Sequence, residues 1–227
     1  MVQPLRMGIG MTNSPKENRS NELEQIKNNL SPEINNKLMF LKWLTDRLEE
    51  RHILGCPILV GESAVQVYTF GNYGSVDLDI LTHDIDATVD ILRNTGFKLF
   101  GRQWYSSELD ITVDIVSGEF PEKLQKLNYR GTDILLSSVE DMIIDRLTAA
   151  VYWGARQNIQ AKDDFRWAEL MLALSISSES AYSADIEYLK KRAAEEDVSP
   201  WLELMLEKRR QKQAAEKRDD DVEFHER

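Results

Sequence analysis

Two aspartates separated by a single residue, Asp77 and Asp79, carry the strongest chemical signal in this sequence. Apolar and polar residues alternate around them, which predicts a β-strand over residues 76–81. Because side chains alternate along a strand, the two carboxylates would share one face, about 6–7 Å apart, while Val76 and the other apolar residues take the opposite face. Unpaired carboxylates on one face repel each other, and a divalent cation removes that repulsion. The pair therefore predicts a site for Mg²⁺ or Mn²⁺.

A third carboxylate, Asp114, follows on another apolar run at residues 109–116, where the alternation again predicts a strand. If the two strands are neighbours, about 4.8 Å apart, Asp114 would complete a three-carboxylate site. Asp110 shares the face of Asp114 and is an alternative third ligand, although it lies nearer the end of the strand. A D-x-D pattern also occurs on solvated strand faces, so the interpretation depends on the surrounding elements.

A glycine-led turn into a helix precedes the two aspartates. The apolar run at residues 57–60 predicts a buried strand, Gly61 ends it, and residues 63–70 predict a short helix. The start of a helix presents backbone N–H groups and the positive end of its dipole, which favour phosphate. A metal site beside a phosphate site indicates metal-assisted phosphoryl or nucleotidyl transfer, in which an ion lowers the pKa of the attacking hydroxyl.

These motifs together resemble the nucleotidyltransferase superfamily related to DNA polymerase beta. Its pattern is a glycine followed by glycine or serine, a short gap, an aspartate pair around one residue, and a third acid on a later strand. Here 13 residues lie between Gly61-Glu62-Ser63 and Asp77-Leu78-Asp79. The downstream part resembles the branch that includes the abortive-infection type IV toxin nucleotidyltransferases, in Ser138-Val139-Glu140-Asp141, Arg146-Leu147-Thr148-Ala149, Arg156 and Lys162-Asp163.

The resemblance implies an α/β fold with a small mixed nucleotidyltransferase sheet, flanked by helices and followed by a C-terminal helical region. It also implies transfer of a nucleoside monophosphate from an NTP to an acceptor hydroxyl on RNA, protein or a small molecule, and a possible antitoxin partner. Carried over by position, the catalytic carboxylates and metal ligands are Asp77, Asp79 and Asp114, of which Asp114 also helps to deprotonate the acceptor. The triphosphate would be bound by Gly61, Ser63, Arg146 and Lys162.

Two positions depart from the pattern of that branch. Glu62 places a carboxylate where a second glycine or serine is expected, beside the predicted polyphosphate. Tyr73 and Ser75 occupy places where relatives carry an arginine and a threonine, so one phosphate contact is missing. These departures favour an alternative function, in which a catalytically degenerate relative acts as a regulatory or interaction module.

Arg146 is singled out by helical periodicity as well as by the resemblance. It lies seven residues after Val139, on the apolar face of the helix expected at residues 138–153. A cation on an inward face needs a partner, which is either a buried acid or a phosphate. We expect Arg146 to face the acidic cluster and to bridge to Asp77 or Asp79 when no nucleotide is bound.

The remaining elements follow from capping residues and periodicity. We expect further helices at residues 31–50, 84–94, 162–174, 183–194 and from 200 onward, a strand at 97–105 that pairs with 109–116, and a last strand at 133–136. The predicted organisation is a polar leader at 1–30, a nucleotidyltransferase core at 31–137, a helical region at 138–206, and a charged tail at 207–227.

The composition restricts the class of protein further. The chain has 227 residues and a net charge of −11, which argues against broad coating of nucleic acid. Cys56 is the only cysteine and the three histidines are scattered, so neither an intrachain disulfide nor a zinc site is predicted. No apolar run approaches the ~18 residues of a membrane span, and residues 1–20 lack the apolar centre of a signal peptide. A cytoplasmic protein without a membrane partner is expected.

Overall fold

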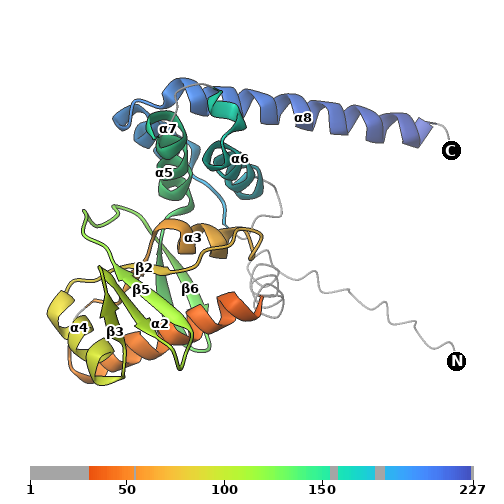
Figure 1. The fold of residues 1–227 in the computed structure, drawn as a ribbon. Helices are drawn as coiled ribbons and strands as arrows, with labels where there is room; N and C mark the ends of the chain where they lie inside the picture. The colour runs from red at the N-terminus through yellow and green to blue at the C-terminus, as the bar shows by residue number, and fades with distance from the viewer. Residues whose placement is uncertain (1–30, 54, 154–157, 177–181, 226–227) are drawn as a thin grey trace, which may run out of the picture.

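A mixed seven-stranded sheet forms the centre of the protein, and helices cover it (Figure 1). The structure is a computed structural model that describes residues 31–53, 55–153, 158–176 and 182–225, with side chains to residue 214. The leader expected at 1–30, and Arg156, lie outside the described residues. The strand order is β3-β4-β5-β2-β1-β7-β6. The strands are β1 (Ile58–Leu59), β2 (Leu78–Leu81), β3 (Lys98–Phe100), β4 (Gln103–Ser106), β5 (Ile111–Ile115), β6 (Leu124–Tyr129) and β7 (Thr132–Ser137).

The helices begin where their capping residues predict. Ser31 caps α2 and Asp84 caps α4, each by accepting a hydrogen bond from a backbone N–H of the first turn. Ser138 caps α5 in the same way. The described helices are α2 (Pro32–Glu50), α3 (Gly61–Tyr68), α4 (Ile85–Asn94), α5 (Val139–Tyr152), the 3₁₀ turn η1 (Ile159–Ala161), α6 (Asp163–Ser175), α7 (Ile186–Glu195) and α8 (Ser199–His225).

Helix α3 lies between the sheet and the C-terminal helices, and it contacts α5 and α6 as well as β2 (Figure 1). One continuous core joins the two parts, because fully buried side chains of α2 and the sheet belong to the same cluster as those of α5 and α6. Helix α8 crosses the boundary expected near residue 207 without a break and projects beyond the body (Figure 1). Among the described helices, none is both long and apolar enough to cross a membrane.

The acidic strand is shorter than predicted. Strand β2 begins at Leu78, so Asp77 lies just before it, and Val76 is 90% exposed instead of facing the core. The carbonyl of Asp77 accepts hydrogen bonds from the side chains of Lys37, Ser63 and Ser75. These side-chain donors replace a sheet partner for that backbone oxygen, which explains why the strand starts at Leu78, two residues later than predicted.

Two further strands differ from the sequence prediction. The single strand expected at 97–105 is a hairpin, β3 and β4, which turns at Gly101 and Arg102. Gly101 has φ +62°, a conformation that glycine adopts without strain. Strand β6 was not predicted, because only Leu127 and Tyr129 of its six residues are buried at this edge of the sheet. Its polar, exposed residues gave no clear apolar alternation.

Candidate functional site

The three predicted carboxylates converge at the N-terminal end of β2. Ligand oxygens of Asp77, Asp79 and Asp114 all lie within 4.8 Å of one another. Strand β2 runs parallel to β5 and pairs Asp79 directly with Asp114. The sequence prediction that these side chains lie within reach of one ion is therefore confirmed. Asp110 takes no part in the cluster, since it has φ +51° in the turn before β5 and is exposed.

The electrostatics of the cluster favour a cation. Burial, followed by the charges of Asp77 and Asp114, raises the pKa of Asp79 to about 6, although a hydrogen bond from the backbone of Glu62 opposes the rise. Asp114 is 2% exposed, and its Oδ2 atom is buried without a hydrogen bond in the described part of the chain. A buried, unsatisfied carboxylate oxygen beside two other carboxylates fits the hard-oxygen ligand set of Mg²⁺ or Mn²⁺.

The β3–β4 hairpin reaches over this cluster from the neighbouring edge of the sheet. The Nε2 atom of Gln103 donates a 2.6 Å hydrogen bond to Oδ2 of Asp77. The Nε atom of Arg102 lies 2.9 Å from Oδ2 of Asp114, an ion pair that lacks hydrogen-bond geometry. Two consecutive residues of the hairpin, the last of the turn and the first of β4, thus contact two of the three carboxylates.

Gly61 brings the start of α3 against Asp79. A Cβ atom on Gly61 would lie 2.6 Å from Oδ2 of Asp79, and the φ of +58° also disfavours any other residue. The backbone N–H of Val60 donates to the carbonyl of Asp79 at 3.0 Å, so the turn and the strand are joined by their backbones. The glycine therefore allows a helix start to approach the acidic cluster, as expected for a phosphate site.

Ser63 is buried behind the backbone of residues 75–77 and is not exposed in the cleft. Its side chain is 1% exposed, and Oγ donates to the carbonyl of Asp77 and lies 3.2 Å from Oγ of Ser75. The triphosphate contact predicted for Ser63 is therefore not available to its hydroxyl in this arrangement. Ser63 instead fixes the backbone that carries Asp77.

Lys37 is a site residue that the sequence reasoning missed. Its Nζ atom is buried and donates to two carbonyls of the loop before β2, that of Ser75 at 2.5 Å and that of Asp77 at 3.2 Å. It also donates to Oε1 of Gln66 at 2.9 Å. Burial lowers the pKa of Lys37, while Glu33, Asp77 and Asp79 raise it. The available signal was its position on the apolar stripe of α2, three residues after Ile34.

A cleft of 780 Å³ opens beside the carboxylates, between the sheet and α5 and α7. The acids that line it are Glu62, Asp77, Asp79, Glu119, Glu122, Asp141 and Asp145. The arginines that line it are Arg102, Arg146 and Arg192. The volume lies within the range usual for small-molecule sites. Because carboxylates outnumber arginines, an anionic ligand would need metal ions to enter.

Arg146 lines this cleft and is 9% exposed, so the prediction of an inward face is confirmed. The predicted bridge to Asp77 or Asp79 is wrong. The guanidinium instead pairs with Asp145 at 2.8 Å, with Asp164 at 3.1 Å and with Glu62 at 3.6 Å. Asp164 comes from the first turn of α6, which packs along α5 and so brings a second carboxylate to Arg146 beside that of Asp145.

The two departures from the family pattern lie next to each other. The side chain of Glu62 lies beside the hydroxyl of Tyr73, and burial, followed by the interaction with Glu62, raises the pKa of Tyr73 to about 12. Tyr73 also packs edge-on against Trp167, with ring centroids 4.8 Å apart. Tyr73 and Glu62 therefore form one structural unit with Arg146, on the side of the cleft nearest α6.

Lys162 lies outside the cleft lining. Its Nζ atom donates to the carbonyls of Ala150 and Trp153, at the C-terminal end of α5. This contact satisfies carbonyls that the helix end leaves without partners. The structure thus gives Lys162 a helix-capping contact and does not bring it to the acidic cluster.

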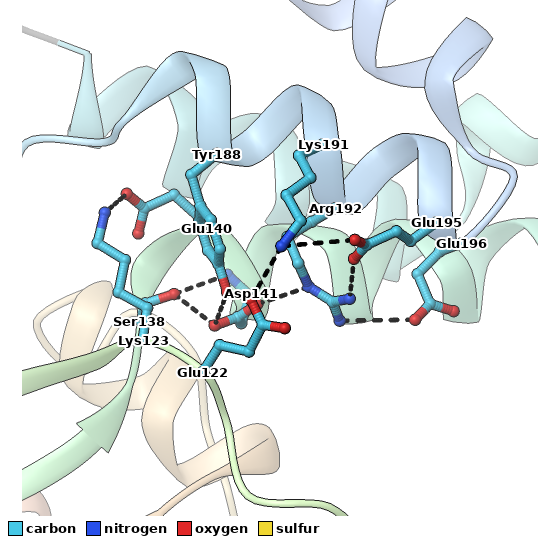
Figure 2. Close-up of polar contacts among 10 residues, drawn as sticks. All are labelled: Glu122, Lys123, Ser138, Glu140, Asp141, Tyr188, Lys191, Arg192, Glu195 and Glu196. Atoms are coloured by element: carbon cyan, nitrogen blue, oxygen red, sulfur yellow. Dashed lines mark hydrogen bonds and ion pairs between the residues drawn. The ribbon is translucent and has the colours of Figure 1, made fainter.

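A polar network closes the far wall of the cleft and joins α5 to α7 (Figure 2). Asp141 accepts from Nε of Arg192 at 2.9 Å, from the hydroxyl of Tyr188 at 3.1 Å and from Oγ of Ser138 at 2.7 Å. Glu140, 2% exposed, pairs with Lys123 at 2.6 Å. The motif at 138–141 therefore caps α5 and attaches α7, which forms one wall of the cleft.

Comparison of this chain with models of known families, with curated protein sequences and with solved structures found no match. The resemblance to the nucleotidyltransferases thus stays a prediction from the motifs. The described geometry supports a mixed α/β fold with three convergent carboxylates beside a cleft.

Proposed function

We propose that this chain is a metal-dependent nucleotidyltransferase, which moves a nucleoside monophosphate from an NTP to an acceptor hydroxyl and releases pyrophosphate. The observation that carries the proposal is the convergence of Asp77, Asp79 and Asp114 beside a cleft of 780 Å³. Mutual repulsion and burial make this cluster unfavourable without a cation, as the raised pKa of Asp79 indicates.

Each carboxylate has a role in this reaction. Asp77, Asp79 and Asp114 would hold Mg²⁺ or Mn²⁺, which when bound neutralises phosphate charge and lowers the pKa of the acceptor hydroxyl. The Oδ2 atom of Asp114 has no hydrogen bond in the described chain but is paired with the exposed guanidinium of Arg102. Once that guanidinium is displaced, Oδ2 would accept the proton of the acceptor hydroxyl. The backbone at Gly61, where α3 begins, faces Asp79 and is the nearest helix start for a phosphate group.

The acceptor is an RNA end, a protein side chain or a small molecule with a hydroxyl group. Carboxylates outnumber arginines along the cleft, and the whole chain carries a net charge of −11. Both features favour a short or neutral acceptor over a long nucleic acid, whose phosphates would be repelled.

The direct test measures pyrophosphate release from each of the four NTPs with Mg²⁺ and with Mn²⁺, using the protein's own hydroxyls and added RNA as acceptors. The Asp79→Asn variant should release none, and the Asp90→Asn variant, whose carboxylate is on the exposed side of α4, should match the parent. Pyrophosphate release that persists in Asp79→Asn would refute the assignment of the carboxylates.

A second function is favoured by the arrangement around Glu62. Glu62 lies beside Tyr73 and 3.6 Å from Arg146, which also pairs with Asp145 and Asp164. These three carboxylates neutralise Arg146, the cation to which the resemblance assigns phosphate binding. An arginine that is already neutralised suits a catalytically degenerate module. Calorimetry separates the two functions, since NTP binding that requires Mg²⁺ supports the enzyme and its absence for all four NTPs supports the module.

A further inference from the structure

Arg102 occupies an unusual position at the tip of the β3–β4 hairpin. The turn consists of Gly101 and Arg102, because Phe100 pairs with Gln103 across it. Gly101 has positive φ and Arg102 does not, which is the pattern of a type II′ turn, a favoured two-residue connection for a hairpin. Strand β4 continues from this turn along β5 and pairs Gln103 with Asp114. The hairpin therefore fixes the Arg102 backbone beside the acidic cluster and leaves its side chain free to move.

The ion pair of Arg102 is asymmetric. The Arg102 side chain is 82% exposed, whereas that of Asp114 is 3% exposed. Their 2.9 Å contact lacks hydrogen-bond geometry, so Oδ2 of Asp114 is left without a hydrogen bond in the described chain. Because the guanidinium is exposed, solvent screens its side of the pair, and it can leave Asp114 for another anion. The buried carboxylate of Asp114 then needs a second cation beside it.

The other two arginines of the cleft are held more firmly. Arg146 pairs with Asp145, Asp164 and Glu62, and it is largely buried. Arg192 pairs with Asp141, Glu195 and Glu196 (Figure 2). Arg102 is paired with Asp114 alone among the described ion pairs. Of the three cleft arginines, it is the one that can change partner without breaking a network.

A metal ion on the carboxylates would repel the guanidinium from Asp114, because both are cations competing for one anion. The flexible arginine side chain would then be released next to the cleft that it already lines. A guanidinium fits the oxygens of a phosphate group by its planar fork, as it fits a carboxylate. The released side chain thus suits the anionic part of a metal-bound substrate.

We propose that Arg102 exchanges Asp114 for the polyphosphate of the nucleotide when metal binds. This inference rests on the proposed function. Its consequence is that Arg102 opposes binding of the metal alone but supports binding of a metal-bound polyphosphate. A residue with only a structural role would not act in opposite directions on these two equilibria.

The test compares two affinities in Arg102→Ala and the parent. The first is the affinity for Mn²⁺ alone, followed by its electron paramagnetic resonance signal. The second is the affinity for inorganic tripolyphosphate at saturating Mg²⁺, followed by calorimetry, since this probe carries the phosphate chain without a base. Arg102→Lys retains the charge, and Arg47→Ala is a matched control, because Arg47 is also exposed and pairs with a single carboxylate, that of Glu50.

In Arg102→Ala we expect Mn²⁺ to bind about two- to fivefold more tightly, because the ion no longer competes with the solvent-screened guanidinium for Asp114. Tripolyphosphate should bind about tenfold more weakly, the effect of one charge-assisted hydrogen bond. Arg102→Lys should recover most of the tripolyphosphate affinity, and Arg47→Ala should change neither value. Unchanged tripolyphosphate affinity in Arg102→Ala would overturn the role of Arg102 while leaving the metal site intact. Failure of the parent to bind Mn²⁺ would overturn the proposed function together with this inference.

Discussion

Replacing Asp79 with asparagine should make the metal-free protein more stable at neutral pH, although it removes a residue of the proposed metal site. Asp79 lies against Asp77 and Asp114, and burial together with their charges raises its pKa from 3.8 to about 6. A carboxyl group with a raised pKa in the folded state binds its proton more tightly there than in the unfolded chain. The folded protein is therefore penalised wherever the group must be ionised, and asparagine removes that penalty.

The magnitude follows from the size of the shift. A tenfold change in an ionisation constant corresponds to about 1.4 kcal/mol, so the penalty at pH 7 has an upper limit of about 3 kcal/mol. Asp79 is only partly buried, and solvent screening reduces the value to about 1 kcal/mol. The penalty is absent below about pH 4, grows between pH 4 and 6, and is complete above pH 6. For a chain of this size, about 1 kcal/mol corresponds to about 2–4 °C in Tm.

The assay is thermal unfolding of the parent and of Asp79→Asn at pH 4.5 and pH 7.5, in EDTA and in Mg²⁺. In EDTA the Tm of the variant should exceed that of the parent at pH 7.5, and the difference should fall to about a third at pH 4.5, where the penalty is only partly developed. Added Mg²⁺ should raise the Tm of the parent but not that of the variant. The Asp90→Asn variant, whose carboxylate pairs with Arg93 on the surface, should show none of these changes. A variant that is less stable than the parent in EDTA at pH 7.5 would refute the repulsion on which the metal site is argued.

Lys37→Met should lower the free energy of unfolding by about 2 kcal/mol in urea titrations, because the carbonyls of Ser75 and Asp77 lose a charged donor, and it should weaken Mn²⁺ binding. Gly61→Ala should destabilise by about 1–3 kcal/mol in the same titrations, since its Cβ would lie 2.6 Å from Oδ2 of Asp79 and its φ is positive. Lys162→Ala should lower Tm without changing NTP affinity measured by calorimetry, because its contacts cap α5. A loss of binding free energy larger than the loss of unfolding free energy would instead show that Lys162 contacts the nucleotide.

Much of the core of this fold follows from local signals in the sequence. Serine and aspartate caps place the starts of α2, α4 and α5, and apolar alternation places β5. The convergence of Asp79 with Asp114 was also predictable, because both acids lie on short apolar strands and a parallel pairing sets them side by side. The edge strand β6 was missed because an edge buries few residues and leaves little apolar pattern to detect.

The partners of the buried cations were harder to predict than their positions. Helical periodicity places Lys37 and Arg146 on inward faces, and both are buried. Periodicity within one helix carries no information about which acceptors a neighbouring segment supplies. For Arg146 these come from α3 and α6, and for Lys37 they come from the loop before β2. The same limit applies to Glu62 and Tyr73. Taken one at a time in the sequence, Glu62 is a carboxylate beside the predicted polyphosphate and Tyr73 is a missing phosphate contact. In the folded chain their side chains lie beside each other and Glu62 pairs with Arg146, a tertiary arrangement that neither position indicates alone.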